Sequence, residues 1–311
     1  MAMHAIRIHA FGGPEVLQDD TLPLPVPGHE EILVRIAAAS VNPVDGKIRA
    51  GKHPSVKDDD LPVTMGRDLS GVVEATGDNV QGVAPGDAVF AMLGWDRGSY
   101  AQHVVLKLGE FTPKPQNLSH VEAAAVPLAA LTAWQGLMDH GKLQKGQRVL
   151  IHGGAGGVGH FAVQIAKAMG AWVATTCSAR DIDFVRKLGA DRAIDYKAET
   201  FEDVVANIDL VYDLVGGETQ DRSFKVLKHG GRLVSTLQEP DKAGAIAAGV
   251  TGIHYMAAPN AAELAEIGKL LLSGRIKPFV FATYPLQEAA QAQAALEKGA
   301  VQGKIVLTVD P

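Results

Sequence analysis

Short apolar runs and turn-forming clusters alternate through the first 110 residues of the chain. Residues 4–12, 30–41, 70–77 and 87–93 are rich in branched apolar residues, and clusters of proline and glycine separate them. Short strands with turns at intervals of roughly ten residues are typical of a small barrel or sandwich. The first part of the chain is therefore predicted to be a β domain.

From residue 119 the pattern changes to helices that alternate with strands. An Ala- and Leu-rich segment at 119–141 predicts a helix with Ser119 as its N-cap. Helices are also predicted at 158–170, 179–190, 201–208 and 218–230. Apolar runs between them predict strands at 148–154, 172–178, 192–196, 209–216 and 231–237. This alternation predicts an α/β fold with a doubly wound parallel sheet.

The end of the chain has a different pattern again. Residues 252–258 predict an edge strand, and residues 260–274 predict a helix. A strand at 276–286, a helix at 287–300 and a strand at 303–309 follow. This last segment need not join the parallel sheet, and it could instead return to the first domain and make that domain discontinuous.

Composition narrows the class of protein. A chain of 311 residues suggests two domains, and a net charge of −6 without a basic block argues against nucleic-acid binding. The single cysteine, Cys177, excludes an internal disulfide and any zinc site built from several cysteines. The N-terminus has no hydrophobic signal core, and no run reaches the roughly 18 apolar residues of a membrane span. A soluble, cytoplasmic protein is expected.

A glycine-rich loop predicts the cofactor. The G-x-G-x-x-G pattern falls on Gly154, Gly156 and Gly159, with Gly157 and Val158 inside the loop. It follows a predicted strand and opens a predicted helix, which is the context that gives this pattern its meaning. Glycines there allow a tight turn and a close approach of the backbone to a pyrophosphate, which the helix N-terminus attracts. The alternative is a glycine-rich turn that binds no ligand.

The strand at 172–178 indicates which dinucleotide binds. NAD-binding sheets usually end their second strand with an acidic residue that binds the ribose, but this strand ends in Cys177 and Ser178, and Arg180 follows. A hydroxyl and a guanidinium suit a 2′-phosphate, so NADPH is favoured over NADH. In the alternative, Arg180 is an ordinary helix residue and Asp181 or Asp183 binds the ribose.

Several motifs in the same order resemble the medium-chain dehydrogenase/reductase superfamily, most of all its zinc-free quinone oxidoreductase and alkenal/enone reductase branch. They are AIRIHAFGGPEVL, AAASVNPVDGKIRAG, PLAALTAWQGL, VLIHGGAGGVGHFAVQIAKAMGA, TTCSARDIDFVRKLGADRAIDYK, DLVYDLVGG and GKIVLTV. The resemblance implies a GroES-like β-barrel-type catalytic domain at 1–122, a Rossmann NADPH-binding domain at 123–275, and a segment at 276–311 that returns to the catalytic domain. It also implies a homodimer, which the predicted edge strand at 252–258 could form.

The same resemblance also indicates whether the protein binds a catalytic zinc ion. Zinc-bearing relatives place a cysteine where this chain has Asn42, and a Gly-His-Glu motif where it has Gly66, Arg67 and Asp68. Because arginine has no lone pair to give a metal, no zinc is expected. Without a metal, hydride transfer suits acceptors that are already electrophilic, namely quinones and α,β-unsaturated carbonyls. The alternatives are an enoyl-thioester reductase, an alcohol dehydrogenase-like enzyme, or a non-catalytic NADPH-binding sensor.

Three residues are the catalytic candidates. Asn42 resembles a family asparagine near the nicotinamide, where its amide would bind a ribose hydroxyl or the substrate oxygen; otherwise it shapes the turn before Pro43. Asp45 would orient a neighbour or the cofactor, or be structural. Lys47 stands where many relatives have tyrosine, and it would donate a proton or polarise a carbonyl, or be a solvated lysine.

Further residues are expected at the cofactor. Thr132 and Tyr196 resemble family residues that line the cofactor pocket, and packing is the alternative for each. Val215 and Leu237 are assigned by position, since they lie near C-terminal ends of sheet strands, and Gly303 and Lys304 are assigned by position as well. Trp95 and Tyr255 are candidate walls of the substrate site or packing residues.

Arg67 and Asp68 form an unusual charged pair in an otherwise apolar stretch. Neighbours on a strand point to opposite faces, so the two side chains are expected to have separate partners. A structural role is favoured for the pair.

Overall fold

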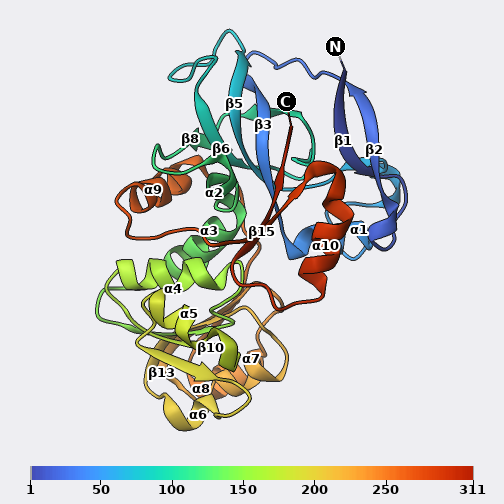
Figure 1. Cartoon of the computed structure of the whole chain (residues 1–311). Helices are drawn as coiled ribbons and strands as arrows, with labels where there is room; N and C mark the ends of the chain where they lie inside the picture. The colour runs from blue at the N-terminus through green and yellow to red at the C-terminus, as the bar shows by residue number, and fades with distance from the viewer. Residues whose placement is uncertain (1, 311) are drawn as a thin grey trace. The chain divides into compact units, whose positions relative to one another are not determined.

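The structure is a computed structural model that describes residues 2–310. The chain forms two compact units, which are described separately (Figure 1). The first unit contains the residues up to Leu128, then Ala258–Leu272, and the chain from Pro278 onward. The second unit contains Ala129–Ala257 and Ser273–Lys277.

The first unit is built on a seven-stranded sheet. Six strands follow the order β15-β16-β3-β5-β6-β8, and β7 also pairs with β3. Their bounds are β3 Glu31–Val41, β5 Asp68–Thr76, β6 Ala88–Met92, β7 His103–Lys107, β8 Phe111–Pro113, β15 Val280–Pro285 and β16 Lys304–Thr308. A smaller sheet has the order β2-β1-β4, with β1 at Ala2–Ile8, β2 at Leu17–Pro23 and β4 at Val63–Thr64.

The core of this unit lies on the apolar faces of these strands. Ile32, Val34 and Ile36 alternate along β3 and are at most 1% exposed. They belong to one cluster with Leu69, Leu106 and Ile305 among other residues. The strand β16 lies between β15 and β3. It is antiparallel to β3, and Ile305 lies opposite Val41. The last strand of the chain is thus an inner strand of a sheet whose other members come mostly from its beginning.

Short helices complete the first unit. They are α1 Pro43–Arg49, η2 Asp58–Asp60, α2 His120–Ala124, α9 Ala261–Leu272 and α10 Ala289–Glu297, with η1 at Pro14–Val16 and η5 at Leu286–Glu288. The helix α1 was absent from the sequence prediction. It begins with a capping box, because the side chain of Asp45 accepts the Asn42 backbone N–H at 2.8 Å, and Pro43 supplies a favourable first residue.

The second unit is a six-stranded parallel sheet with helices. Its order is β11-β10-β9-β12-β13-β14, the doubly wound arrangement of a dinucleotide-binding fold. The strands are β9 Arg148–His152, β10 Trp172–Cys177, β11 Arg192–Asp195, β12 Ile208–Asp213, β13 Leu227–Ser235 and β14 Thr251–His254. The helices are α4 Gly159–Ala168, α5 Ile182–Lys187, α6 Phe201–Val204, α7 Glu218–Ser223 and α8 Lys242–Ala248. The predicted fold class is confirmed.

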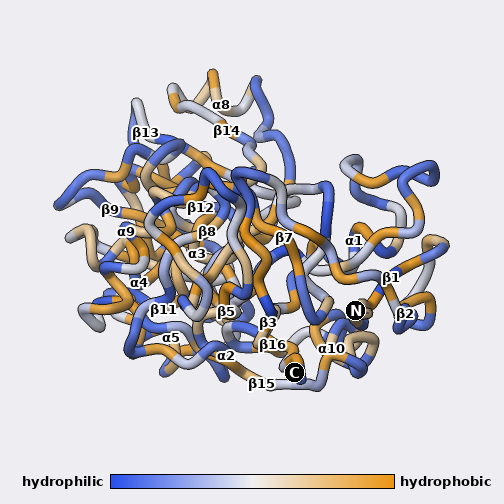
Figure 2. The backbone as a smooth tube through the Cα atoms, turned by 90° about the horizontal axis from the view of Figure 1, so that it is seen from above, coloured by the Kyte–Doolittle hydropathy of each residue, from blue (hydrophilic) through white to orange (hydrophobic). Residues whose placement is uncertain are grey.

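Two predicted helices differ from the structure. Pro127 interrupts the segment at 119–141, so α2 is followed by a separate helix, α3 Pro127–Trp134, and then by a π-helical turn at Gln135–His140. The helix predicted at 218–230 ends at Ser223, because β13 begins at Leu227. In Figure 2 apolar residues gather along inner strands, whereas many turns are hydrophilic. No helix within residues 2–310 is both long and apolar enough to cross a membrane.

Ile305→Ala tests whether β16 is part of the core of the first unit. The residue is fully buried, so we expect the substitution to lower the free energy of unfolding by about 2–5 kcal/mol. Urea unfolding measures this change, with Thr283→Ala on the exposed side of β15 as the control, for which about 0.5 kcal/mol or less is expected. Equal midpoints for the two variants would contradict this assignment.

Candidate functional site

The glycine-rich loop of the second unit has the geometry that a pyrophosphate requires. It connects β9 to α4, and a Cβ on Gly154 would lie 2.0 Å from Thr175 Oγ1. A Cβ on Gly159 would lie 2.1 Å from the Gly153 carbonyl oxygen, so both glycines are needed for close packing. A Cβ on Gly156 would meet only one atom within 4 Å, at 3.5 Å, so the backbone is open at this point. The loop therefore fits a dinucleotide.

The N-terminus of α4 supports the same conclusion. Val158 is the N-cap and follows Gly157, and no side chain caps the helix. The first-turn amides of a helix have no partners within the helix, and the helix dipole favours an anion there. The residues present therefore fit the phosphates of a dinucleotide at this helix end.

The tips of β10 and β11 bring the predicted ribose-pocket residues together. The Tyr196 N–H donates to the Cys177 carbonyl at 3.2 Å, which places Tyr196 beside the segment that carries Ser178 and Arg180. The side chain of Arg180 is 57% exposed, and Tyr196 is 58% exposed. The Ser178 hydroxyl donates to the carboxylate of Asp181, which is buried. A cation and an aromatic ring are thus presented to solvent here, while the nearest acid is turned inward.

Val215 and Leu237 follow the C-terminal ends of β12 and β13. Both are exposed, and the Asp213 carboxylate fixes the turn after β12 by accepting the Val215 and Gly216 N–H groups at 3.0 and 2.9 Å. Because the strands are parallel, these residues lie at the same edge of the sheet as the glycine-rich loop.

Thr132 and Tyr255 are both buried in the second unit. The carbonyl of Thr132 accepts the hydroxyl of Tyr212 at 3.0 Å and also the hydroxyl of Tyr255. Tyr255 is only 6% exposed, so packing is its role in the described unit. A contact of the Thr132 hydroxyl with the cofactor stays a prediction.

In the first unit the side chain of Asn42 is held by two side chains and one backbone carbonyl. Its Oδ1 accepts the ammonium of Lys304, and its Nδ2 donates to Asp68 Oδ1 at 3.1 Å and to the Ser40 carbonyl at 3.3 Å. Asn42 is 2% exposed. Both amide hydrogens are therefore used within the protein, whereas Oδ1 keeps one free lone pair. Asn42 can accept a hydrogen bond from a ligand but has no hydrogen left to donate to a carbonyl.

Lys304 and Asp68 are the buried charges behind Asn42. The Lys304 ammonium also donates to the Val41 carbonyl at 2.9 Å, and burial lowers its pKa. Asp68 accepts the Ser40 hydroxyl at 2.7 Å, and burial raises the pKa of its carboxyl. Gly303, with φ of +64°, has the conformation that lets the chain enter β16 just before Lys304.

Asp45 lies beside this group and is fully buried. Its Oδ2 accepts the Asn42 N–H and, at 2.9 Å, the hydroxyl of Tyr100, while its Oδ1 has no hydrogen-bond partner. Burial raises the pKa of Asp45 to about 7. The carboxyl therefore exchanges a proton near neutral pH, which few aspartates do.

Lys47 is exposed on α1, two residues after Asp45 and therefore on another side of the helix. A cavity of about 600 Å³ is lined by α1, by the residues around η1 and by α10, and both Asn42 and Lys47 contribute to its wall. The structure thus brings two of the three catalytic candidates to one cavity and places Asp45 behind them.

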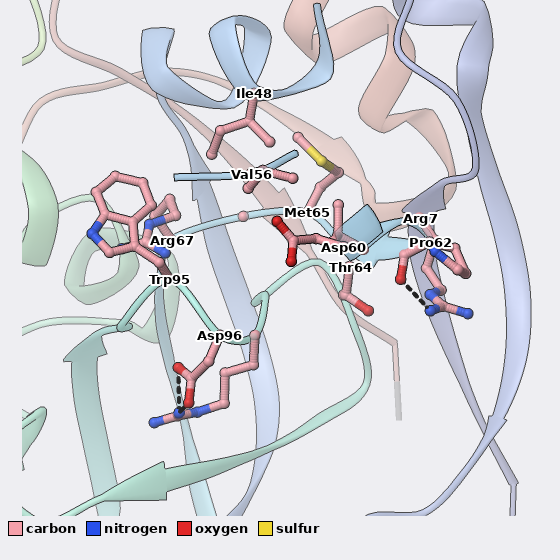
Figure 3. Close-up of a pocket in the computed structure, with 13 residues that line it drawn as sticks. Arg7, Ile48, Val56, Asp60, Pro62, Thr64, Met65, Arg67, Trp95 and Asp96 are labelled. Atoms are coloured by element: carbon pink, nitrogen blue, oxygen red, sulfur yellow. Dashed lines mark hydrogen bonds and ion pairs between the residues drawn. The ribbon is translucent and has the colours of Figure 1, made fainter. Parts of the chain in front are cut away.

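Arg67 and Asp68 have separate partners, as expected. The guanidinium of Arg67 donates to the carbonyls of Gly94 and Leu93 and lies 3.6 Å above the ring of Trp95. Figure 3 shows Arg67 and Trp95 together at one side of a cavity of about 250 Å³. Trp95 also stacks on His53, with ring centres 4.6 Å apart.

The sequence analysis did not identify three residues that contact the predicted site residues. Ser40, His53 and Tyr100 carry no motif of their own, although Asn42-Pro43 followed by Asp45 was a readable helix-cap signal. Within residues 2–310 no three His, Cys, Asp or Glu side chains gather in a way that could hold a metal ion.

Comparisons with known proteins agree with this geometry. Residues 28–116 match an alcohol dehydrogenase GroES-like domain, and residues 188–307 match a family described as zinc-binding dehydrogenase. The chain is 35% identical to the mouse NAD(P)H oxidoreductase RTN4IP1, mitochondrial, over 99% of this chain and 89% of that protein. It is 33% identical to the Arabidopsis thaliana NADPH-dependent alkenal/one oxidoreductase, chloroplastic, over 96% and 77%. The structure of a quinone oxidoreductase from Coxiella burnetii has a TM-score of 0.93 at 36% identity, with full coverage of both chains.

Asp45→Asn tests the buried carboxyl. An unfolded aspartate has a pKa of about 3.9, so between pH 4 and 7 the folded wild type holds a proton that the unfolded chain has lost. The stability of the wild type relative to Asp45→Asn should therefore fall as pH rises through this range, by on the order of 4 kcal/mol, and then level off.

Urea unfolding at pH 4 to 8 measures this difference. The control is Asp59→Asn at an exposed aspartate of η2, which should show no such slope. A stability difference for Asp45→Asn that does not change with pH would refute the raised pKa.

Proposed function

The chain belongs to the quinone oxidoreductase and alkenal/one oxidoreductase branch of the medium-chain dehydrogenase/reductase superfamily, and we propose that it is an NADPH-dependent reductase of quinones or α,β-unsaturated carbonyls. Family membership makes it an NAD(P)H-dependent oxidoreductase. The observation that carries the finer proposal is the set of side chains around Asn42. An amide, an ammonium and two carboxyls meet there, an arrangement suited to orienting ligands.

The tip of β10 supports NADPH over NADH. Arg180 is exposed and pairs with Asp181 only through its Nε, at 3.6 Å, while the Ser178 hydroxyl also donates to that carboxylate. Asp183, the other acid that could bind a ribose, lies 3.7 Å from Arg186 and is 85% exposed. Arg180, with Tyr196 beside it, is proposed to bind the 2′-phosphate.

Asn42 is proposed to orient the cofactor. Because its one free hydrogen-bonding position is a lone pair on Oδ1, it would accept a hydroxyl, such as that of the nicotinamide ribose. This role replaces the alternative in which the amide donates to the substrate carbonyl. Lys304 and Asp68 then act as positioning residues, because they determine which way the amide faces.

The reaction is proposed to proceed without zinc. Asn42 and Arg67 stand where zinc-bearing relatives have ligands, and arginine cannot ligate a metal at neutral pH. The dihydronicotinamide, when bound, supplies a hydride. A proton completes the reduction to a hydroquinone or a saturated carbonyl. Quinones and enones are suitable acceptors because the charge that develops on oxygen is delocalised.

Lys47 is proposed to serve the acceptor oxygen. It is exposed in the cavity that Asn42 also lines, and an ammonium there would stabilise the developing negative charge or supply the proton. Asp45 is buried behind it and is proposed to hold α1 in place through the Asn42 N–H and the Tyr100 hydroxyl.

Arg180→Ala is expected to raise KM for NADPH by about 10- to 100-fold, with little effect on KM for NADH, because a charge-assisted contact to the 2′-phosphate is lost. Steady-state kinetics with both coenzymes measures this, and Arg186→Ala on α5 is the matched surface-arginine control. A wild type that prefers NADH would overturn the assignment of NADPH.

The acceptor class is tested by NADPH oxidation with 1,4-benzoquinone, 9,10-phenanthrenequinone, acrolein and longer alkenals. We expect turnover of at least one conjugated acceptor, and we expect that Lys47→Met lowers kcat more than it raises KM for that acceptor. Tight binding of NADPH without turnover of any acceptor would favour a non-catalytic sensor instead.

A further inference from the structure

The cavity of about 250 Å³ in the first unit has an apolar floor and a charged rim. Ile48, Val56 and Met65 are at most 8% exposed and form the floor. The charged residues of its wall are Arg7, Asp60, Arg67, Asp96 and Arg97. Figure 3 shows Arg67 beside Trp95 at one side of the cavity and Arg7 beside Pro62 at the opposite side.

Of the three arginines in this wall, only Arg67 lacks a carboxylate partner. Arg97 pairs with Asp96 at 2.7 Å and with Glu110, and Arg7 pairs with Asp20 at 3.4 Å. Within residues 2–310, no carboxylate oxygen lies within 4 Å of the Arg67 guanidinium nitrogens. Its acceptors are two backbone carbonyls, and its Nε has no hydrogen-bond partner.

This difference matters because Arg67 is also the most deeply buried of the three. It is 3% exposed, whereas the side chains of Arg7 and Arg97 are 19% and 17% exposed. A buried charge is costly unless counter-charges accompany it. Burial lowers the pKa of Arg67, and it outweighs the carboxyls that stabilise the charge, which are those of Asp45, Asp68, Glu110 and Asp96. The direct contacts of its guanidinium are two carbonyl dipoles and an indole face. A guanidinium placed in this way is suited to an anion that comes from outside the chain.

We propose that this cavity binds the carboxylate of the acceptor substrate through Arg67, so that the preferred acceptors are conjugated carbonyl compounds that carry an acidic group. The inference rests on the proposed reductase function and specifies its substrate class. Planar guanidinium groups bind carboxylates in a fixed geometry, which gives selectivity as well as affinity. The pKa of Arg67, which burial lowers to about 10, still leaves it charged at neutral pH.

The cavity's size limits the substrate. A cavity of roughly 150 Å³ holds benzene, so 250 Å³ accommodates one ring with a short side chain or a short acyl chain. Two acids of the rim do not prevent an anion from binding beside Arg67. Asp96 is shared by Arg97 and Lys107, and Asp60 is exposed and accepts the Lys57 N–H at 2.7 Å.

The cavity beside Arg67 and the Asn42 cluster are built partly from the same two segments, although Asn42 and Lys47 line a different cavity. Ile48 of its floor lies on α1, whose N-terminus is capped by Asn42 and Asp45. Asp68, which holds the Asn42 amide, follows Arg67 directly in sequence. The cavity beside Arg67 and the Asn42 cluster are therefore adjacent along the chain at two points, α1 and the start of β5.

The test compares two acceptors that differ in charge. One is trans-3-benzoylacrylate, and the other is trans-1-phenyl-2-buten-1-one, in which a methyl group replaces the carboxylate. The two differ in intrinsic reactivity, so the readout is the ratio of their kcat/KM values in each variant. We expect Arg67→Met to lower the anion-to-neutral ratio by about 10- to 100-fold, and Arg67→Lys to lower it less.

A matched control separates this contact from a general effect of charge. Arg35→Met removes an arginine of the same unit that pairs with Glu74 at 3.1 Å and does not line the cavity. We expect its ratio to equal that of the wild type. A ratio that is the same in Arg67→Met and the wild type overturns the inference, even where both still reduce the neutral ketone.

A binding measurement decides the question independently of turnover. Calorimetry with 3-benzoylpropionate, the saturated product, should give a Kd at least about tenfold weaker for Arg67→Met than for the wild type and for Arg35→Met. Equal Kd values in all three proteins would overturn the inference. If neither acceptor is reduced by any of them, the proposed function fails, and the calorimetry alone decides whether Arg67 binds a carboxylate.

Discussion

The hydrogen bond from the Lys304 ammonium to Asn42 Oδ1 connects the two ends of the first unit. It joins side chains 262 positions apart, one on the last strand and one at the start of α1. The contact forms only because β16 pairs with β3 in the register that sets Ile305 opposite Val41. The cap of α1, the orientation of the Asn42 amide and the position of Lys47 within α1 all depend on this pairing.

Burying these groups is expensive, and the chain compensates each in a different way. Lys304 is compensated through Asn42 by Asp68, which in turn accepts hydrogen bonds from Ser40, Asn42 and the Leu128 N–H. Asp45 accepts two hydrogen bonds on one oxygen and none on the other, and its raised pKa reflects this incomplete compensation. These buried side chains form their hydrogen bonds with protein atoms instead of water, so their orientation is fixed before any ligand binds.

The features that could be predicted from the sequence are those formed by residues close together along the chain. The glycine-rich loop was predicted because strand, loop and helix follow one another between residues 148 and 168. The separate partners of Arg67 and Asp68 were also predicted, from the alternation of side chains along a strand, although β5 begins only at Asp68. The contact of Lys304 with Asn42 could not be predicted in this way, because it depends on the pairing of distant strands. The same holds for the cavity beside Arg67, whose wall is drawn from β1, α1, η2 and the loop at Trp95.

Lys304 and Arg67 are two buried cations of the first unit to which the proposals above give different roles. Both are cations that are 3% exposed, and they flank the same aspartate, since Asp68 interacts with Lys304 through Asn42 and follows Arg67 in sequence. The chain supplies Lys304 with hydrogen-bond acceptors on a side chain and a carbonyl, which makes it a fixed part of the scaffold. Arg67 receives two backbone carbonyls and an indole ring, and it also lines a cavity. Among the described residues neither cation has a carboxylate within 4 Å, and Asp45 and Asp68 stabilise the charge of both. What distinguishes Arg67 is its place in the wall of a cavity, which is why the proposal gives it a ligand and gives Lys304 the protein's own amide.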